Sequence, residues 1–523
     1  MWGQLNITHI VVVACLVAGG VVDLLTNGTT TSEDLAKTYL ARIAKINPST
    51  RSFLEVSPFA LEDARKRDNE RRGTGVRSKM HGVPILVKEP VSIDGLNSSA
   101  GSYCLLGSRT RNEASVVARL RAAGATYLNG AAHVRSARRP LTAGVLSGGQ
   151  TCGVYYREQD PCGSSSGSGV AVALGLAAGA VEVETMGSIT CPAMRDNLVS
   201  IKTTSGLVPR DNVIVTRFRG PVGPMTRTVR DAAIMLNFVA GPTSEDPDTL
   251  RIPFSISLKL GGLVNSRLAV PRNNGDDPSV AKMDLVPVME QFDGDLNVVR
   301  GLGARIIDDA NYSSYEEINA ADAPQGRVGP AEYRFDIERC FRSLAVHPYG
   351  IRTVEDLINC TKTLPKEEYP ARDVAYWEQV VKSADFGSPE MTKEIERMRD
   401  LGGTRGIDAV IDTHKADAIV FPSVCSSDVP SLVGYPVVCV PLGFIPEGTE
   451  AERNTKRGFG GASAWHTLFT EKLIELAYAF EQHTQIGRQR KPVVLPVADT
   501  CDILQERRVV WRVWGKLREW FVI

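Results

Sequence analysis

The sequence predicts an α/β fold, because short apolar segments typical of buried strands alternate with longer amphipathic segments typical of helices. The clearest strand is residues 82–88, an apolar run with proline only near its start. The clearest helix is residues 114–124, which Gly124 ends before another strand. A chain of 523 residues could hold several domains, but large α/β enzymes often form one.

The other elements are predicted from the same signals. Hydroxyl and acidic residues at 30–34 predict a helix start, and Asn47-Pro48 predicts its end, because a residue before proline avoids helical backbone. Alternating charges over residues 59–72 predict a helix with a solvated face. Further helices are predicted at residues 229–239, 278–302 and 471–482, and within the charged region 312–404. Further strands are predicted at residues 263–271, 304–308, 417–422 and 435–441.

The composition excludes some classes of protein. Sixty basic residues balance sixty acidic ones, so the net charge of zero gives no field that would attract nucleic acid. The ten cysteines show no C-x-x-C or histidine-rich spacing, which argues against a zinc site and against a small disulfide framework. We therefore expect most cysteines to be buried apolar residues.

The two ends of the chain leave alternatives open. Residues 10–22 are apolar but short for a membrane span, and residues 1–9 lack the basic residues of a signal peptide. A first helix packed on the domain, a weak signal or anchor and a wrongly assigned start all remain, so a cytoplasmic or a secreted location is open. Residues 506–523 are amphipathic, which suits a docked helix or contact with a membrane or partner. We divide the chain into residues 1–22, 23–500 and 501–523.

Residues 161–206 hold the strongest functional signal. A Gly/Ser-rich loop at residues 163–169 precedes a small-residue apolar run at 170–181, and a second Ser/Gly turn follows at 185–188. The pattern predicts a loop, a buried helix of about three turns, a short strand and a turn. Glycines beside serines let another backbone or a substrate come close. Two such loops joined by one helix could bring two hydroxyls into one site.

This stretch resembles the amidase-signature hydrolases, especially a fungal-type branch, through D-P-C-G-S-S-S-G-S at residues 160–168 and S-I-T-C-P-A at 188–193. Segments 81–88, 116–125, 223–229, 434–443 and 473–482 match in the same order, so the resemblance covers roughly residues 20–500. It extends to fatty acid amide hydrolase and to the amidase-like core of the glutamine-dependent amidotransferases. It implies a single large domain with a twisted mixed sheet and helices on both faces. It also implies hydrolysis of a small-molecule carboxamide without metal or cofactor.

The resemblance assigns roles by position. Ser188 matches the nucleophile and Lys88 the base, and a spacing of 24 residues to Ser188 selects Ser164, over Ser165 and Ser166, as the bridging serine. Backbone N–H groups of the turn at Thr185, Met186 and Gly187, up to Ser188, would bind the oxyanion and substrate.

The sequence itself agrees with a base at position 88. Lys88 ends an apolar strand, where burial lowers the pKa of a lysine and leaves an amine able to accept a proton. A lysine that extends from a strand end to solvent is the plainer alternative.

Departures from the family pattern leave a second function open. Met186 stands where the family has Gly or Asp, Thr190 where many members have Arg, and Asn197 and Ser200 where they have glycines. Glu89-Pro90 replaces Asp-Asn after the lysine. A weakened or inactive relative that serves in binding or as a partner subunit is therefore the alternative to an amidase, and homodimer formation and membrane contact stay open.

Two other readings are disfavoured. The loop fits G-x-S-x-G of a Ser–His–Asp hydrolase, but residues 157–161 before it are not the apolar strand that such an elbow needs. His133 is interpreted as a surface residue. Membership of a glutamine-dependent amidotransferase complex would require partner proteins, which the single long chain and the fungal-type resemblance disfavour.

Overall fold

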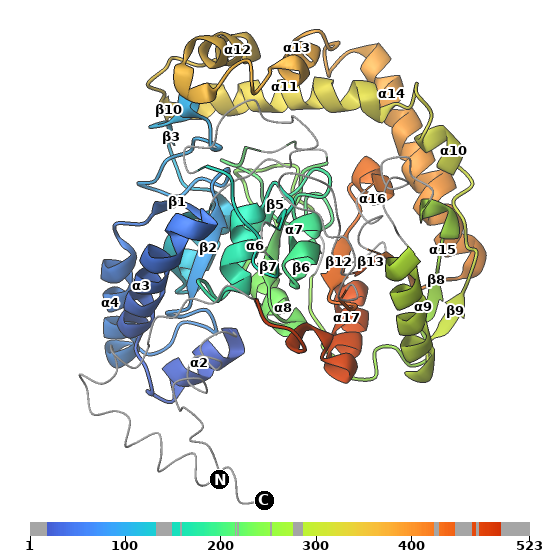
Figure 1. Cartoon of the computed structure of the whole chain (residues 1–523), viewed down its shortest axis with the longest axis horizontal. Helices are drawn as coiled ribbons and strands as arrows, with labels where there is room; N and C mark the ends of the chain where they lie inside the picture. The colour runs from blue at the N-terminus through green and yellow to red at the C-terminus, as the bar shows by residue number, and fades with distance from the viewer. Residues whose placement is uncertain are drawn as a thin grey trace, which may run out of the picture.

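The fold is built on an 11-stranded mixed sheet with the strand order β1-β4-β2-β5-β7-β6-β12-β13-β11-β8-β9 (Figure 1). The computed structural model describes residues 18–131, 149–156, 159–214, 216, 219–251, 254–275, 286–422, 428–444, 463–466 and 470–492. The strands are β1 (Phe53–Val56), β2 (Pro84–Lys88), β4 (Thr126–Ala131), β5 (Ala180–Val183), β6 (Val199–Lys202), β7 (Val222–Thr226), β8 (Arg267–Ala269), β9 (Arg305–Ile307), β11 (Ala418–Pro422), β12 (Val437–Val440) and β13 (Ser463–His466). A separate two-stranded sheet pairs β3 (Arg109–Thr110) with β10 (Leu344–Val346).

The sheet has two parallel parts joined by an antiparallel middle. Strands β4, β2 and β5 are parallel neighbours, as are β11, β8 and β9. Between them, β5, β7, β6, β12, β13 and β11 pair antiparallel. Every residue of β2 and β5 is buried, as expected for strands covered on both faces. This confirms the predicted mixed α/β architecture.

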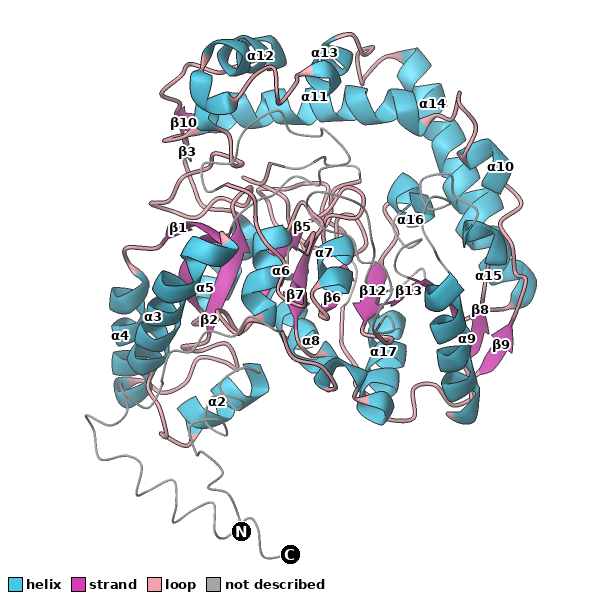
Figure 2. Cartoon of the chain, in the orientation of Figure 1, coloured by secondary structure: helices cyan, strands magenta, loops and turns pink. Residues whose placement is uncertain are grey.

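Helices cover both faces of the sheet (Figure 2). Helices α5, α8 and α17 form one group, in which α8 contacts both of the others, and α6 and α7 contact each other in a second group. The helices are α2 (Ala18–Thr26), α3 (Ser32–Thr50), α4 (Ala60–Gly73), α5 (Ser115–Ala122), α6 (Ser166–Ala173), α7 (Thr190–Arg195), α8 (Val229–Val239), α9 (Val286–Gly301), α10 (Tyr315–Ile318), α11 (Gln325–Ser343), α12 (Val354–Thr363), α13 (Ala375–Val381), α14 (Pro389–Arg399), α15 (Asp408–His414), α16 (Asp428–Val433) and α17 (Thr470–Thr484). Shorter turns are η1 (Tyr103–Leu105), η2 (Arg272–Gly275), η3 (Pro365–Glu367), the π-helical η4 (Asp400–Ile407) and η6 (Ile486–Arg488).

Two predicted helix boundaries were wrong. Helix α3 begins where its caps predict, with the Thr31 side chain accepting from the Asp34 N–H, but it runs past Pro48 to Thr50. Proline is tolerated there because little helix remains beyond it, and Arg51 in the left-handed region returns a hydrogen bond to the Asn47 carbonyl.

Helix α6 is the second wrong boundary, since it starts at Ser166, inside the predicted loop, and ends at Ala173. Its glycines serve close packing: a Cβ at Gly169 would lie 2.4 Å from Asp196 Oδ2 and 3.4 Å from Pro192 Cβ on α7. Small residues in this run therefore reflect a tight contact between α6 and α7 as well as a loop.

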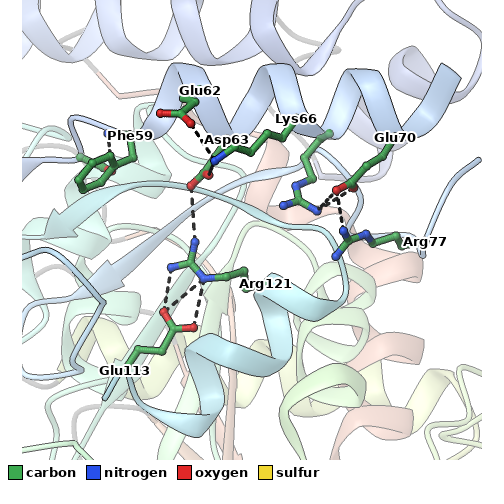
Figure 3. A network of polar contacts seen from close by, with 10 residues as sticks. Phe59, Glu62, Asp63, Lys66, Glu70, Arg77, Glu113 and Arg121 are labelled. Atoms are coloured by element: carbon green, nitrogen blue, oxygen red, sulfur yellow. Dashed lines mark hydrogen bonds and ion pairs between the residues drawn. The ribbon is translucent and has the colours of Figure 1, made fainter. Parts of the chain in front are cut away.

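The charged face of α4 is held by ion pairs (Figure 3). Lys66 pairs with Glu62 one turn earlier, and Arg77 pairs with Glu70. Arg121 of α5 bridges Glu113 and Asp63, which ties α4 to the neighbouring helix. Of the charged residues of this helix, Glu62, Arg65 and Lys66 are exposed, as predicted. Arg67 and Asp68 are buried instead, and the Asp68 carboxyl accepts from the N–H groups of Ser32 and Glu33.

Of the apolar N-terminal segment, only residues from Ala18 onward are described. They begin α2, whose Val21 and Leu25 are buried in the main core. The predicted tail at residues 501–523 lies outside the described residues. Among the helices that the structure describes, none has the length and apolar character needed to cross a membrane.

The cysteine prediction was wrong for four residues. Cys104 is bonded to Cys360 and Cys162 to Cys191, with sequence separations of 256 and 29 residues. Partners so far apart leave no local spacing motif, so only the fold brings them together.

A helical arch, defined here as residues 325–399 from α11 to α14, spans one side of the molecule (Figure 1). It has an apolar cluster of its own, in which Phe341, Leu357 and Trp377 pack with Leu105 from the main body. The Cys104–Cys360 disulfide and a buried ion pair between Arg219 and Glu332 join the arch to the body.

Candidate active site

Lys88 lies at the end of β2 and is fully buried. Its Nζ donates to Ser164 Oγ at 2.8 Å and to the Val183 carbonyl oxygen at 3.1 Å. The side chain therefore points into the protein, toward the Gly/Ser loop, and does not extend to solvent. The structure thus brings together two of the three residues that the sequence predicts for catalysis.

Burial also changes the acid–base behaviour of this amine. Desolvation lowers the pKa of Lys88 to about 8, against the opposing effect of the nearby Glu182 and Glu184 carboxyls. A lysine with a pKa this close to neutrality is deprotonated in a large fraction of molecules in mildly alkaline solution. It can therefore accept a proton where an ordinary lysine could not.

The two serine loops lie against each other. Ser164 precedes α6, after a cis peptide bond from Gly163, and Ser188 lies between β5 and α7. The Ser165 N–H donates to the Ser188 carbonyl at 3.2 Å, and the Cys162–Cys191 disulfide links the same two segments. Ser164 and Ser188 are both partly exposed, while Lys88 is buried. A substrate could therefore reach the two hydroxyls from outside while the amine stays dry.

Glu184 shapes the turn that carries Ser188. Its Oε1 accepts from the Gly187 N–H at 2.8 Å, and its Oε2 accepts from the N–H groups of Ile189 and Thr190 at 2.6 and 2.8 Å. These hydrogen bonds to the fully buried Glu184 side chain hold the turn in its conformation. Sequence analysis missed Glu184. The signal was present, since two acidic residues, E-V-E at 182–184, interrupt an otherwise apolar run.

Thr185, Met186 and Gly187 line the partly exposed side of this turn. Gly187 has φ 79°, which suits glycine, and its N–H donates a hydrogen bond to Glu184. Among the described residues, the N–H groups of Thr185, Met186 and Ser188 donate to no other group. The Thr185 hydroxyl lies 3.3 Å from that of Thr216.

Of the departures from the family pattern, Asn197, Thr190 and Glu89 make local hydrogen bonds, whereas the buried Ser200 hydroxyl has no partner among the described residues. Asn197 takes the left-handed region with φ 55°, which asparagine tolerates better than most residues, and its side chain donates to the Gly487 carbonyl at 2.9 Å. Thr190 belongs to the Glu184 network, and Ser200 is buried on β6. Burial raises the pKa of Glu89 to about 7, while its carboxyl accepts from the Ser99 N–H. His133 lies outside the described residues.

Val213, Ile214 and Arg219 connect this region to the helical arch. The Ile214 N–H donates to the carbonyl of Pro90, two residues after Lys88. Cys340 of α11 contacts the Val213 carbonyl, and Arg219 pairs with Glu332 of α11 at 2.7 Å. The arch therefore lies over the same end of β2 as the two serine loops.

Comparison with known proteins decides the family. The Amidase family model matches residues 34–309 of this chain. A putative amidase of Arthroderma benhamiae is 35% identical over 492 residues, which cover 90% of this chain and 82% of that protein. The chain belongs to the amidase family.

Two further relatives agree. A probable amidase of Arabidopsis thaliana is 32% identical over 88% of each chain. The native peptide amidase of Stenotrophomonas maltophilia superposes with a TM-score of 0.78 at 30% identity, covering 91% of this chain and 98% of that one. The protein is thus an amidase of the amidase-signature type, a hydrolase acting on amide C–N bonds, and the resemblance found in the sequence is confirmed.

Proposed function

We propose that this amidase cleaves carboxamides to an acid and an amine through a Ser–Ser–Lys relay and an acyl-enzyme. The observation that carries the proposal is the 2.8 Å contact between the buried Lys88 amine and Ser164 Oγ, at a loop packed on the segment that bears Ser188. Neutral Lys88 takes the proton of Ser164 as Ser164 takes that of Ser188. The Ser188 oxygen then forms a bond to the amide carbon.

The same proton completes the first half-reaction. As the C–N bond breaks, the Lys88 ammonium returns its proton through Ser164 to the leaving nitrogen, which departs as amine or ammonia. Water then attacks the acyl-enzyme, gives its proton to the relay and releases the acid with a restored Ser188 hydroxyl. Neutral Lys88 is thereby regenerated for the next turnover.

The oxyanion is assigned to the turn at residues 185–188. Because the Gly187 N–H already donates to Glu184, the N–H groups of Thr185, Met186 and Ser188 are the available donors within the described part of the chain. Loss of one such donor typically costs about 3 kcal/mol in transition-state stabilisation.

The similarity to peptide amidase supports an amide on a peptide as the substrate class. The helical arch is a candidate for contacts with this substrate, because Cys340 contacts the Val213 carbonyl and Val213 bridges to Val91, close after Lys88. A substrate panel should therefore include peptide C-terminal amides together with primary amides, anilides and fatty amides.

A fluorophosphonate probe tests the nucleophile directly. We expect the wild-type protein to be labelled and Ser188→Ala to remain unlabelled and inactive. Ser166→Ala is the matched control, because Ser166 lies in the same Gly/Ser stretch but its hydroxyl donates to the Cys162 carbonyl. This control should be labelled and should turn over substrate.

The alternative function has a distinct result. A wild-type protein that is folded, takes up no probe and releases no amine from any member of the panel would be an inactive relative that binds amides or partners. Labelling retained in Ser188→Ala would instead place the nucleophile elsewhere.

A further inference from the structure

Glu182 is a buried acid that the relay does not use. It lies on β5, its side chain is fully buried, and neither carboxyl oxygen accepts a well-formed hydrogen bond from the described part of the chain. A carboxyl in this condition is costly in a protein interior. It calls for an explanation beyond packing, since an apolar residue would fill the same space without that cost.

The sheet register places Glu182 beside the catalytic lysine. Leu86 pairs with Ala180 and Val87 with Val181 in the parallel β2–β5 ladder, so the next pair is Lys88 and Glu182. Residues opposite each other in a ladder project to the same face of the sheet. On its other side Lys88 pairs with Ala131, and on its other side Glu182 pairs with Gly223.

Two serine hydroxyls at the start of helix α6 lie close to Glu182. Ser165 and Ser168 are fully buried and lie close enough to lower the pKa of Glu182, and their hydroxyls have no other partner among the described residues. Ser165 directly follows the bridging Ser164. The carboxyl, the amine and the two hydroxyls therefore form one buried polar cluster beneath the relay.

The neighbouring Glu184 does not have the same freedom. It accepts three N–H groups of the Ser188 turn, and its charged neighbours are Lys88 and the buried Lys202 of β6. Within the described residues Glu182 has no such donors, and Lys88 is the charged group that acts on it. Of the two acids near the amine, Glu182 is thus the one that can gain or lose a proton without unfolding the turn.

We propose that Glu182 is a positioning residue of the relay, a buried carboxyl that shares a proton with Lys88 and so sets how readily this amine holds and releases its own. The role as part of a relay rests on the proposed function. Burial raises the pKa of Glu182 to about 7 and lowers that of Lys88 to about 8, so the two groups titrate as a pair. The carboxylate favours the ammonium form, which Lys88 must adopt between attack and departure of the amine.

Direct titration of Lys88 tests this without turnover. In protein labelled with [¹³Cε]lysine, the resonance absent from Lys88→Met reports its protonation. In Glu182→Gln, which removes the counter-charge and keeps the shape, we expect the midpoint to fall by about one pH unit. Glu367→Gln is the matched control, because Glu367 is equally buried but accepts hydrogen bonds from Ser102 and Cys104 and not from the relay. The Lys88 midpoint in this variant should equal that of the wild type.

Kinetics provide the second readout, since the acidic limb of the kcat/KM profile should move to lower pH in Glu182→Gln and stay in place in Glu367→Gln. A Lys88 midpoint that is unchanged or higher in Glu182→Gln overturns the inference. If Glu182→Gln does not fold, Ser168→Ala removes a hydroxyl that favours the charged carboxyl, and a smaller shift in the same direction is expected; no shift overturns the inference.

The two proposals fail separately. If the wild-type protein releases no amine but the Lys88 midpoint still falls in Glu182→Gln, the amidase relay is rejected and the coupling between Glu182 and Lys88 is retained.

Discussion

At the scale of single residues, buried lysines raise the question of which one can act as a base. Lys88 and Lys202 are both fully buried, and burial lowers the pKa of each to about 8. Their contacts separate them: Lys202 donates to the Tyr435 carbonyl, whereas Lys88 donates to a partly exposed serine hydroxyl. Burial alone therefore does not mark a base, because the group that receives or supplies the proton must also be within hydrogen-bond distance.

The pH dependence of activity follows from Lys88. Because the relay needs a neutral amine, kcat/KM should rise with pH through about 8 and level off above it. The measurement is the initial rate at low substrate concentration between mildly acidic and alkaline pH, with circular dichroism at each pH to confirm folding. Activity that falls across this range would contradict a lysine base.

The two lysines offer a matched mutational test. Lys88→Met should reduce kcat by about 100- to 10,000-fold, the usual contribution of a positioned base. Lys202→Met removes an equally buried amine that does not touch either serine, so it should lower stability and retain most of its kcat. Steady-state kinetics on both purified variants make the comparison, and equal losses would show that the effect on Lys88 is structural.

At the scale of elements, the site depends on two short loops held at the ends of β2 and β5. Helices α6 and α7 pack closely through Gly169, and the Cys162–Cys191 disulfide joins the chain just before Ser164 to the chain just after Ser188. The two hydroxyls therefore belong to one rigid unit although 24 residues separate them.

Removal of this disulfide should affect both stability and rate. The double variant Cys162→Ala/Cys191→Ala opens a loop of 29 residues, so we expect a loss of about 3–4 kcal/mol in the free energy of unfolding. We also expect a lower kcat, since the serine loops can separate. Urea unfolding and steady-state kinetics measure the two effects.

The second disulfide is the control. Cys104→Ala/Cys360→Ala loosens the helical arch and leaves the serine loops tied, so stability should fall while kcat is largely kept. The same loss of kcat in both double variants would argue against a specific role for the Cys162–Cys191 bond.

At the scale of the whole molecule, the arch is a second apolar unit attached to the sheet. The Arg219–Glu332 pair joins them, and both side chains are nearly inaccessible to solvent. Such a pair costs desolvation when it forms, but loss of one partner leaves a buried charge without compensation.

Glu332→Ala should therefore destabilise the protein by about 3–5 kcal/mol. Because the arch lies over the end of β2, we also expect a higher KM with a smaller change in kcat. Glu317→Ala, which breaks an exposed pair with Arg405, is the control and should change stability little. Urea unfolding and steady-state kinetics measure both variants, and equal stability losses would show that burial of the Arg219–Glu332 pair contributes nothing.

The sequence predicted the class of fold and most core elements. Strands β2, β9, β11 and β12 and helices α4, α5 and α8 lie within a few residues of their predicted positions, because each has its own apolar period or cap. It was less accurate for α6, where glycines needed for packing were interpreted as a loop, and for α3, where the end of a helix tolerated a proline. It also proposed Lys88, Ser164 and Ser188, through a motif long enough to identify the family.

By itself, then, the sequence determined the family, the alternation of strands and helices and the residue types available for catalysis, because these are written in local patterns. Only the tertiary structure decided which groups meet. The placement of Glu182 beside Lys88 depends on sheet register, both disulfides join segments that are separate in sequence, and the arch is joined to the body by an ion pair between residues 113 apart in sequence. Such contacts are set by how strands pair and layers pack, and neither is visible in the spacing of residues along the chain.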